Sequence, residues 1–516
     1  MNLRRHFAMP HEIVSGFWAV VVVLSVCRLS HIANAQVNNP DAQASKPVES
    51  PTNIDDLRKL QARVTEIIRK SLPTVVAVGN RFGSPNSTAS ITERRLASGV
   101  IIRADGLVLS QYHVSHEGRY EEKTGLVAYG KPGDVVDVVL HDGREVHAEL
   151  LGGSKHPDVS MLRILEPGPY PFMELAQDGP RSLGDWVIKL GHPLGYQPSR
   201  SVVSRLGRIV YINPINLVPD CATTGGDSGG PLINLNGQLI GIPLDSLMPT
   251  AVVHLAKDSS WRRFHLSYIS NEQIRTLQGT MQASVVPRDT LFTNHFERKK
   301  QFELVQEVLP PEHWRSGVRM IEVWKNVQAE LRGSVVEIIL GGKRVAYGTV
   351  VGQEGWILTT ASAVKDYPQC RLPSGAIRPA RIAAVDHDHD LAMLKVDTTE
   401  LKPLGKSTAL SPLAGTFVTT ISLDGSPISA GIVSAPVHEF SVASSLKEKF
   451  TIRDGATVFD HDMPLEKNEL GGPIISLDGR IIGMTVASAG PHGSVAVPLS
   501  SMLSIAARLK GNVDIP

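Results

Sequence analysis

The chain has 516 residues, with 52 Lys or Arg and 51 Asp or Glu, so its formal net charge is +1. This balance gives no support to a nucleic-acid surface or a polyanionic partner. Short Val, Ile and Leu runs alternate with Asp-Gly, Glu-Gly, Ser-Gly and Asn-Gly pairs. Because all-β units run longer than the usual ~150 residues per domain, we expect two all-β domains.

The first 35 residues have the pattern of a secretory signal peptide. Two arginines at residues 4–5 precede an apolar stretch over residues 17–26, and Ala-Asn-Ala at residues 33–35 is an A-x-A cleavage site. We therefore expect an exported protein, periplasmic or secreted, with no transmembrane span after cleavage. An uncleaved membrane anchor is the alternative.

Two amphipathic helices are predicted outside the β-rich regions. Residues 36–52 are rich in Pro, Asn, Gln and Ser and predict a flexible linker. A helix over residues 53–70 follows, with Asn53 as its N-cap and an apolar stripe on one face. A second helix is predicted over residues 312–331. We expect each helix to pack on its own domain.

Three residues along the chain have the types that a nucleophilic hydrolase requires. A predicted strand ends at His113, Asp158 begins another, and Ser228 lies in the run Gly-Gly-Asp-Ser-Gly-Gly at residues 225–230. An Asn-Gly pair at residues 236–237 then predicts a hairpin. A nucleophilic serine needs a base, and the base needs an orienting carboxylate. The order His, Asp, Ser differs from the orders used on other hydrolase folds.

With these residues, the stretch from about residue 71 to residue 277 resembles the protease domain of the HtrA (Deg) family of trypsin-like serine proteases. Further matching pieces are Pro-Thr-Val-Val-Ala-Val (73–78), Gly-Asp-Trp-Val (184–187), Gly-His-Pro-Leu-Gly (191–195) and Ser-Val-Val-Ser-Arg-Leu-Gly-Arg-Ile (201–209). The resemblance implies that His113 is the general base, Asp158 its orienter and Ser228 the nucleophile. It also implies an oxyanion hole formed by the N–H groups of Gly226 and Ser228, and it requires no metal or organic cofactor.

Three further positions gain an interpretation from the resemblance. Ala222 would lie near the base of the S1 pocket, where a small neutral residue favours small or apolar P1 side chains. Asp227 is the residue that a digestive-type trypsin pairs with a freed N-terminal amine. Because no matching activation sequence is present, we expect no such zymogen step. Pro243 lies on the strand expected to pair with substrate, and proline cannot donate a hydrogen bond, which predicts weak or narrow activity.

Residues 313–516 repeat the same segments without the chemistry. Ser362 stands in place of the histidine and Leu470 in place of the serine, and only Asp390 remains. We therefore expect a degenerate, non-catalytic trypsin-like domain where typical HtrA proteins carry a PDZ domain.

Two runs of Asp and His occur in this second copy, at residues 386–390 and 460–462. We place them on the two loops flanking the degenerate cleft. His and Asp suit zinc or manganese, but polar loop runs are far commoner than metal sites, so no metal is predicted. Cys221 and Cys370 are expected to be free.

The sequence thus predicts two tandem trypsin-like domains, each a pair of six-stranded antiparallel β-barrels, with short flanking helices. The active domain covers residues 53–285, a linker residues 286–312 and the degenerate domain residues 313–516. The predicted function is an exported serine endopeptidase that cleaves unfolded or extended protein segments. A non-catalytic peptide-binding scaffold and a regulatory second domain are the alternatives. Protein or peptide substrates are the expected partners, and the resemblance leaves a homo-oligomer open.

Overall fold

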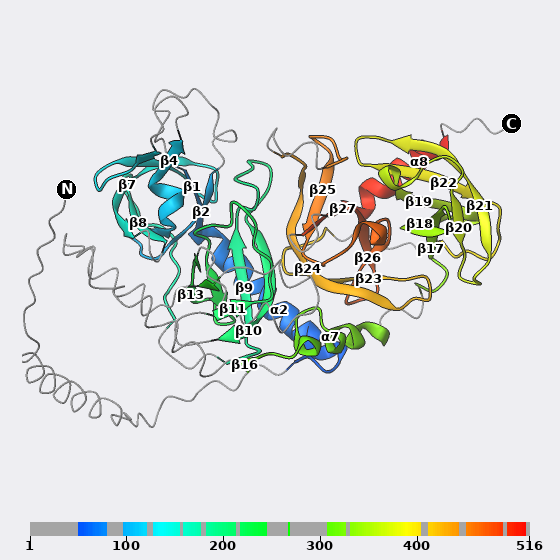
Figure 1. Ribbon diagram of the computed structural model, residues 1–516, viewed down its shortest axis with the longest axis horizontal. Helices are drawn as coiled ribbons and strands as arrows, with labels where there is room; N and C mark the ends of the chain where they lie inside the picture. Colours follow the sequence, from blue (N-terminus) through cyan, green and yellow to red (C-terminus); the bar gives the residue numbers. More distant parts are fainter. Residues whose placement is uncertain are drawn as a thin grey trace, which may run out of the picture. The chain divides into compact units, whose positions relative to one another are not determined.

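The computed structural model describes most of the chain after its first 49 residues (Figure 1). The described ranges are 50–79, 96–120, 127–154, 158–176, 182–212, 217–244, 267–268, 307–326, 331–403, 411–442, 450–488 and 493–511. They belong to one compact unit. The expected signal peptide (1–35), most of the first linker (36–49) and most of the second (286–306) lie outside these ranges. Within them, no helix has the length and apolar character needed to span a membrane.

The N-terminal copy, defined here as strands β1 to β15, begins with a closed six-stranded antiparallel barrel of order β1-β2-β3-β8-β7-β6. Buried Val, Leu and Ile side chains form its hydrophobic core. The strands are β1 (Val75–Gly79), β2 (Ala97–Ile101), β3 (Leu107–Ser110), β6 (Val135–Val139), β7 (Glu145–Ser154) and β8 (Val159–Ile164). A two-stranded ribbon, β4 (Glu117–Tyr120) and β5 (Val127–Tyr129), lies between β3 and β6 in the chain.

The second half of this copy belongs to an eight-stranded sheet of order β13-β12-β9-β10-β11-β15-β14, whose eighth strand, β16, pairs with β10 and follows the copy in the chain. Its described strands do not form a closed barrel; residues 245–266 fall outside the described part. The strands are β9 (Trp186–Gly191), β10 (Val203–Ile212), β11 (Leu217–Pro219), β12 (Leu232–Asn234), β13 (Leu239–Gly241), β14 (Pro243–Leu244), β15 (Ser267–Tyr268) and β16 (Glu307–Val308).

The C-terminal copy, defined as strands β17 to β28, contains two closed six-stranded antiparallel barrels, β17-β18-β19-β22-β21-β20 and β23-β24-β25-β28-β27-β26. The first has β17 (Val335–Leu340), β18 (Lys343–Gly352), β19 (Trp356–Thr360), β20 (Gln369–Arg371), β21 (Ile377–Asp386) and β22 (Leu391–Val396). The second has β23 (Phe417–Ile421), β24 (Pro427–Glu439), β25 (Thr457–His461), β26 (Pro473–Ser476), β27 (Ile481–Ser488) and β28 (Ser494–Pro498), and α8 (Leu499–Gly511) follows. The predicted fold class is confirmed.

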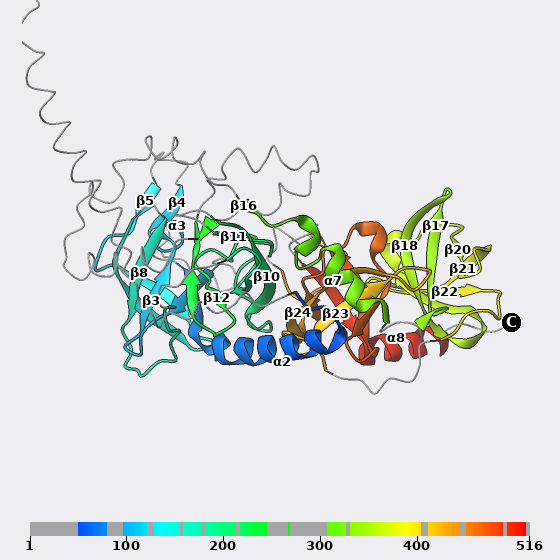
Figure 2. The ribbon, with the colours of Figure 1, turned by 90° about the horizontal axis from the view of Figure 1, so that it is seen from below.

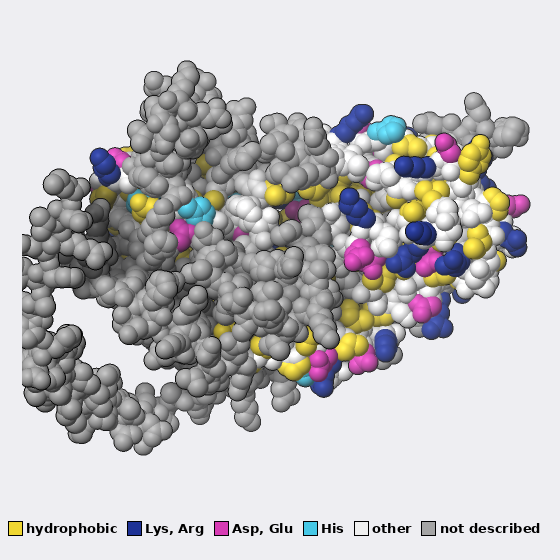
Figure 3. Space-filling view, in the orientation of Figure 1, with side chains coloured by type: hydrophobic (Ala, Val, Ile, Leu, Met, Phe, Trp, Pro, Cys, Tyr) yellow, Lys and Arg dark blue, Asp and Glu magenta, His cyan; other side chains and the backbone are white. Residues whose placement is uncertain are grey.

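On the face drawn in Figure 3, Lys and Arg side chains of this copy lie among Asp and Glu side chains.

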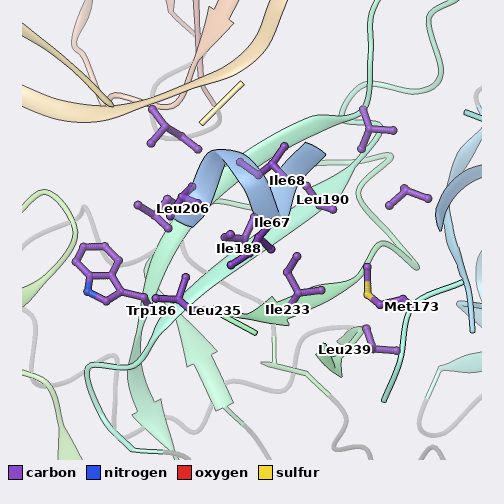
Figure 4. Packing of buried hydrophobic residues seen from close by; sticks show 14 of the residues in the cluster. Ile67, Ile68, Met173, Trp186, Ile188, Leu190, Leu206, Ile233, Leu235 and Leu239 are labelled. Carbon is purple, nitrogen blue, oxygen red and sulfur yellow. The ribbon is translucent and has the colours of Figure 1, made fainter. Parts of the chain in front are cut away.

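The first predicted helix is confirmed as α2 (Ile54–Ser71), and the side chain of Asn53 accepts hydrogen bonds from its first turn. Figure 2 shows α2 extending between the regions of β12 and β23. Its apolar stripe packs on β9 and β10 (Figure 4), where Ile67 and Ile68 belong to the same cluster as Ile188 and Leu206. The expectation that α2 packs only on its own domain is wrong, because the same cluster includes residues of β23 and β24.

The second predicted helix is interrupted. Residues 311–313 form a single 3₁₀ turn, α7 covers only Val318–Val323, and a further 3₁₀ turn covers residues 324–326. The break has a physical cause. The backbone N–H of Arg315 donates to the side chain of Asp220 (2.7 Å) instead of to a helical carbonyl, and its guanidinium is buried. Tertiary hydrogen bonds override helix propensity here.

The burial of α2 generates a stability prediction. Leu57 is fully buried, so Leu57→Ala removes core contacts and leaves a cavity, and we expect the free energy of unfolding to fall by about 2–5 kcal/mol. Urea unfolding followed by circular dichroism measures the change. The exposed neighbour Lys59 is the control, since Lys59→Ala should change the free energy by less than about 0.5 kcal/mol. Equal effects of the two variants would contradict the packing of α2.

Candidate active site

His113 lies in a single helical turn, α3 (Tyr112–Ser115), and not at the end of a strand as predicted. The preceding strand stops at Ser110. The carbonyl of Gln111 then accepts hydrogen bonds from the N–H groups of residues 114 and 115, both at 3.2 Å, and this closes the turn.

The structure brings His113, Asp158 and Ser228 together. The Nδ1 atom of His113 lies 2.6 Å from Oδ2 of Asp158, and its backbone N–H donates to Oδ1 of the same carboxylate at 3.0 Å. The Nε2 atom of His113 lies 3.2 Å from Oγ of Ser228. Asp158 is buried, whereas the side chain of His113 is 40% exposed. In this geometry the imidazole can accept the serine proton while the carboxylate fixes its tautomer and orientation.

The two expected oxyanion donors lie in the loop between β11 and β12. Gly226 has a φ of +96°, and a Cβ there would lie 2.2 Å from the carbonyl oxygen of His192, so only glycine fits. The carbonyl of Gly225 accepts from the N–H of Leu194 at 2.7 Å. Because a trans peptide directs its C=O and N–H oppositely, the N–H of Gly226 points away from Leu194. Among the described residues, neither this N–H nor that of Ser228 donates a hydrogen bond.

Ser98 on β2 holds this loop, a role that the sequence analysis missed. Its N–H donates to the carbonyl of Ser228 at 2.9 Å, and its hydroxyl donates to the carbonyl of Gly226 at 2.7 Å. The same hydroxyl accepts from the N–H of His192 at 2.8 Å, and the carbonyl of Ser98 accepts from the hydroxyl of Ser110 at 2.8 Å. One buried serine thus joins the barrel to both sides of the nucleophile.

The family model named Trypsin-like peptidase domain matches residues 97–242 and residues 346–484, which together exceed half of the chain. The chain belongs to the trypsin-like peptidase family. The first match contains His113, Asp158 and Ser228, and the second covers most of the C-terminal copy.

Several curated serine endoproteases are similar to part of this trypsin-like chain. A probable periplasmic serine endoprotease DegP-like from Rickettsia conorii is 32% identical over 155 residues, covering 28% of this chain and 28% of that protein. The serine endoprotease DegS from Escherichia coli K12 is 30% identical over 209 residues, covering 39% and 54%. A DegP-like protein from Brucella suis is 33% identical over 170 residues, covering 32% and 30%. The matched part of the chain therefore spans about half or less of the length of these relatives. The resemblance to the HtrA (Deg) family is confirmed.

Gln111, two residues before His113, is a second residue of the trypsin-like site that the sequence analysis did not single out. Its side chain is almost fully buried. Its Nε2 donates to Oδ2 of Asp158 (3.0 Å) and to the carbonyl of Pro243 (2.8 Å), and its Oε1 accepts from the N–H of Gly229 (3.0 Å). One amide therefore ties together the orienting carboxylate, the nucleophile loop and β14.

The two other predicted site positions, Ala222 and Pro243, concern substrate preference. Ala222 is fully buried, and its carbonyl accepts from Nζ of Lys189 at 3.3 Å. Pro243 begins β14 and pairs with Tyr268. Because residues after Leu244 lie outside the described part, the S1 preference and the effect of Pro243 on substrate pairing stay predictions.

The C-terminal copy repeats the hydrogen bonds around the base with a different residue. Ser362 occupies the position of the histidine. Its N–H donates to Oδ1 of Asp390 at 2.7 Å and its hydroxyl to Oδ2 at 2.6 Å. Thr451 donates a third hydrogen bond to this carboxylate at 2.7 Å. A serine hydroxyl satisfies the carboxylate but cannot serve as an imidazole base.

The loop around Leu470 is held as the loop around Ser228 is. The N–H of Tyr347 donates to the carbonyl of Leu470 at 2.7 Å, as Ser98 donates to Ser228. The hydroxyl of Thr359 donates to the carbonyl of Tyr347 at 2.7 Å. The hydrogen bonds that hold this loop are therefore present in both copies, whereas leucine offers no nucleophilic atom.

We predicted that both Asp-His runs lie on loops, but the structure places part of each run in a strand. Asp386 ends β21, and Asp460 and His461 end β25. In the described part of the chain, no three His, Cys, Asp or Glu side chains converge as metal ligands would. The carboxylates have other partners: Asp386 pairs with Arg508 and His389, Asp388 with Arg453, and Asp462 with Arg315. Cys221 and Cys370 are free, as predicted.

Removal of the Gln111 amide should impair catalysis. Gln111→Leu leaves the N–H of Gly229 and the carbonyl of Pro243 buried without their partner, at a cost of about 1–3 kcal/mol. The variant also loses the hydrogen bonds that orient Asp158 and the Ser228 loop. We expect kcat/KM for labelled casein to fall about 10- to 100-fold, since each ~1.4 kcal/mol of lost transition-state stabilisation is tenfold in rate. Gln197→Leu is the matched control, because among the described residues Nε2 of Gln197 has no hydrogen-bond partner. Equal kcat/KM in both variants would contradict the role of Gln111.

Buried histidines predict loss of stability in acid. Burial lowers the pKa of His461 and of His192 from 6.5 to about 3, and that of His116 to about 4. Below pH 6.5 these histidines bind protons in the unfolded chain but not in the folded chain. The free energy of unfolding therefore decreases as the pH is lowered. In His461→Gln, the slope between pH 6 and pH 4 should become shallower by about one proton, or ~1.4 kcal/mol per pH unit.

Urea unfolding at several pH values measures this slope. The matching change at the exposed His387, His387→Gln, is the control. A His461→Gln slope equal to that of the wild type would contradict a neutral buried imidazole.

Proposed function

We propose that the chain is an exported serine endopeptidase. Its first domain (residues 53–285), which contains the N-terminal copy, is active, and its second domain (residues 313–516), which contains the C-terminal copy, is catalytically degenerate. The observation that supports this most directly is the contact of His113 with both Asp158 and Ser228, beside two N–H groups that have no partner among the described residues.

In the proposed mechanism, Ser228 Oγ attacks the carbonyl carbon of the scissile peptide as Nε2 of His113 takes its proton. The N–H groups of Gly226 and Ser228 receive the oxyanion. The protonated imidazole then donates its proton to the leaving amine, and Asp158 stabilises the imidazolium. Water, activated by the same base, hydrolyses the acyl-enzyme. No metal takes part.

Unfolded or extended protein segments are the proposed substrates, and the cell envelope the proposed location. Three supports are the HtrA (Deg) resemblance, the relatives named as periplasmic serine endoproteases, and the signal-peptide pattern of residues 1–35. The domain boundaries proposed above follow the two repeated copies.

Labelling with a fluorophosphonate probe tests the proposal. Ser228 Oγ should displace fluoride from phosphorus in the wild type, whereas Ser228→Ala should not label and His113→Ala should lose at least ~10⁴-fold in labelling and in casein cleavage. Ser362→Ala, at the equivalent of His113 in the other copy, should label as the wild type does. A wild type that binds casein but neither labels nor cleaves would favour the scaffold alternative.

A further inference from the structure

Asp227, the residue between the two oxyanion donors, carries a fully buried carboxylate. It accepts hydrogen bonds from Nη1 of Arg205 (2.9 and 3.1 Å), Nζ of Lys189 (3.1 Å) and the N–H of Thr224 (2.9 Å). Burial alone would raise the pKa of Asp227, but the two cations outweigh burial and hold the pKa below its ordinary value. The carboxylate is therefore charged and fixed.

The two cations also need Asp227. Lys189 on β9 and Arg205 on β10 are direct cross-strand partners, and both are almost completely buried. Like charges directly opposite each other repel, so the carboxylate between them stabilises the strand pair as well as the loop. In this protein Lys189 and Arg205 are thus the cations paired with Asp227, the residue that a digestive-type trypsin pairs with a freed N-terminal amine.

Strand β10 connects this ion cluster to the C-terminal copy. The residues on both sides of Arg205 donate hydrogen bonds to the C-terminal copy. The hydroxyl of Ser204 donates to the carbonyl of Ser434 (3.0 Å), and the N–H of Leu206 donates to Oδ2 of Asp462 (3.2 Å). Asp462 is buried, and its charge is balanced by Arg315.

A second connection runs from the C-terminal copy to the peptide that carries the N–H of Gly226. Asp460 forms an ion pair with the buried Arg200 at 3.7 Å. The guanidinium of Arg200 donates to the carbonyls of Pro193 and Gly195. Between those two residues, the N–H of Leu194 binds the carbonyl of Gly225 and so orients the peptide that carries the N–H of Gly226.

We propose that the C-terminal copy, through Asp460 and Asp462, positions the oxyanion hole of the N-terminal copy. These two residues come from the run at 460–462, one of the two considered above as possible metal ligands. In this proposal they are positioning carboxylates, and they act through Arg200 and through β10. This inference rests on the proposed protease function. It gives the degenerate copy a role in the rate of the chemical step rather than in substrate binding.

Asp460→Asn and Asp462→Asn test the inference in the full-length protein. We expect kcat on labelled casein, and the maximal inactivation rate by the fluorophosphonate, to fall at least ~10-fold, yet less than the ~10³-fold upper range for deleting an oxyanion donor. KM and the probe's half-saturating concentration should stay within about twofold, because substrate contacts are unchanged. Asp460→Glu, which keeps the charge, should recover most of the rate.

Asp388→Asn is the matched control, since Asp388 is an exposed partner of Arg453 within the same copy; its rates should equal those of the wild type. Asp462→Asn leaves Arg315 unpaired, so the double variant with Arg315→Met is measured alongside, and thermal melting identifies the folded variants. Unchanged kcat and inactivation rate in folded Asp460→Asn and Asp462→Asn, or an effect on KM alone, would overturn the inference. A wild type that does not label would instead refute the proposed protease function, and the inference with it.

Discussion

The buried carboxylate of Asp227 is the constraint on which the rest of the N-terminal copy depends. A buried charge that lacks a partner is strongly destabilising, typically by 3–5 kcal/mol, so two strands must deliver Lys189 and Arg205 to one point. The register pairs these two residues at the carboxylate of Asp227, which immediately precedes Ser228 in the chain. The same ion cluster therefore links the register of the sheet to the loop that carries Ser228.

The two copies show which parts of a trypsin-like fold are structural and which are chemical. Both keep a carboxylate that receives a backbone N–H and a side chain, at Asp158 and at Asp390. Both hold the residue at the nucleophile position through its carbonyl. Only the N-terminal copy adds the imidazole and the hydroxyl. Because these hydrogen bonds form without the imidazole and the hydroxyl, the C-terminal copy keeps its fold, as its proposed supporting role requires.

Local pattern predicted much of this protein. The order of His113, Asp158 and Ser228, the β-rich repeats and the capped helix α2 follow from short-range signals, and the structure places the three side chains in contact. Gln111 and Arg205 could not be found this way, since their partners lie elsewhere in the chain and nothing local distinguishes them from ordinary polar positions. The interruption before α7 has the same origin, because distant carboxylates bind the segment more favourably than a continuous helix would.

We propose that the loop at Ser228 is positioned to stabilise an oxyanion. The sharpest test is a crystal structure of the full-length protein after reaction with a fluorophosphonate. We expect a phosphonyl group on Ser228 Oγ, with one phosphoryl oxygen about 2.7–3.1 Å from the nitrogens of Gly226 and Ser228, and with Arg205 still bound to Asp227. An adduct whose oxygen faces neither nitrogen, or a loop that has separated Asp227 from both cations, would contradict it.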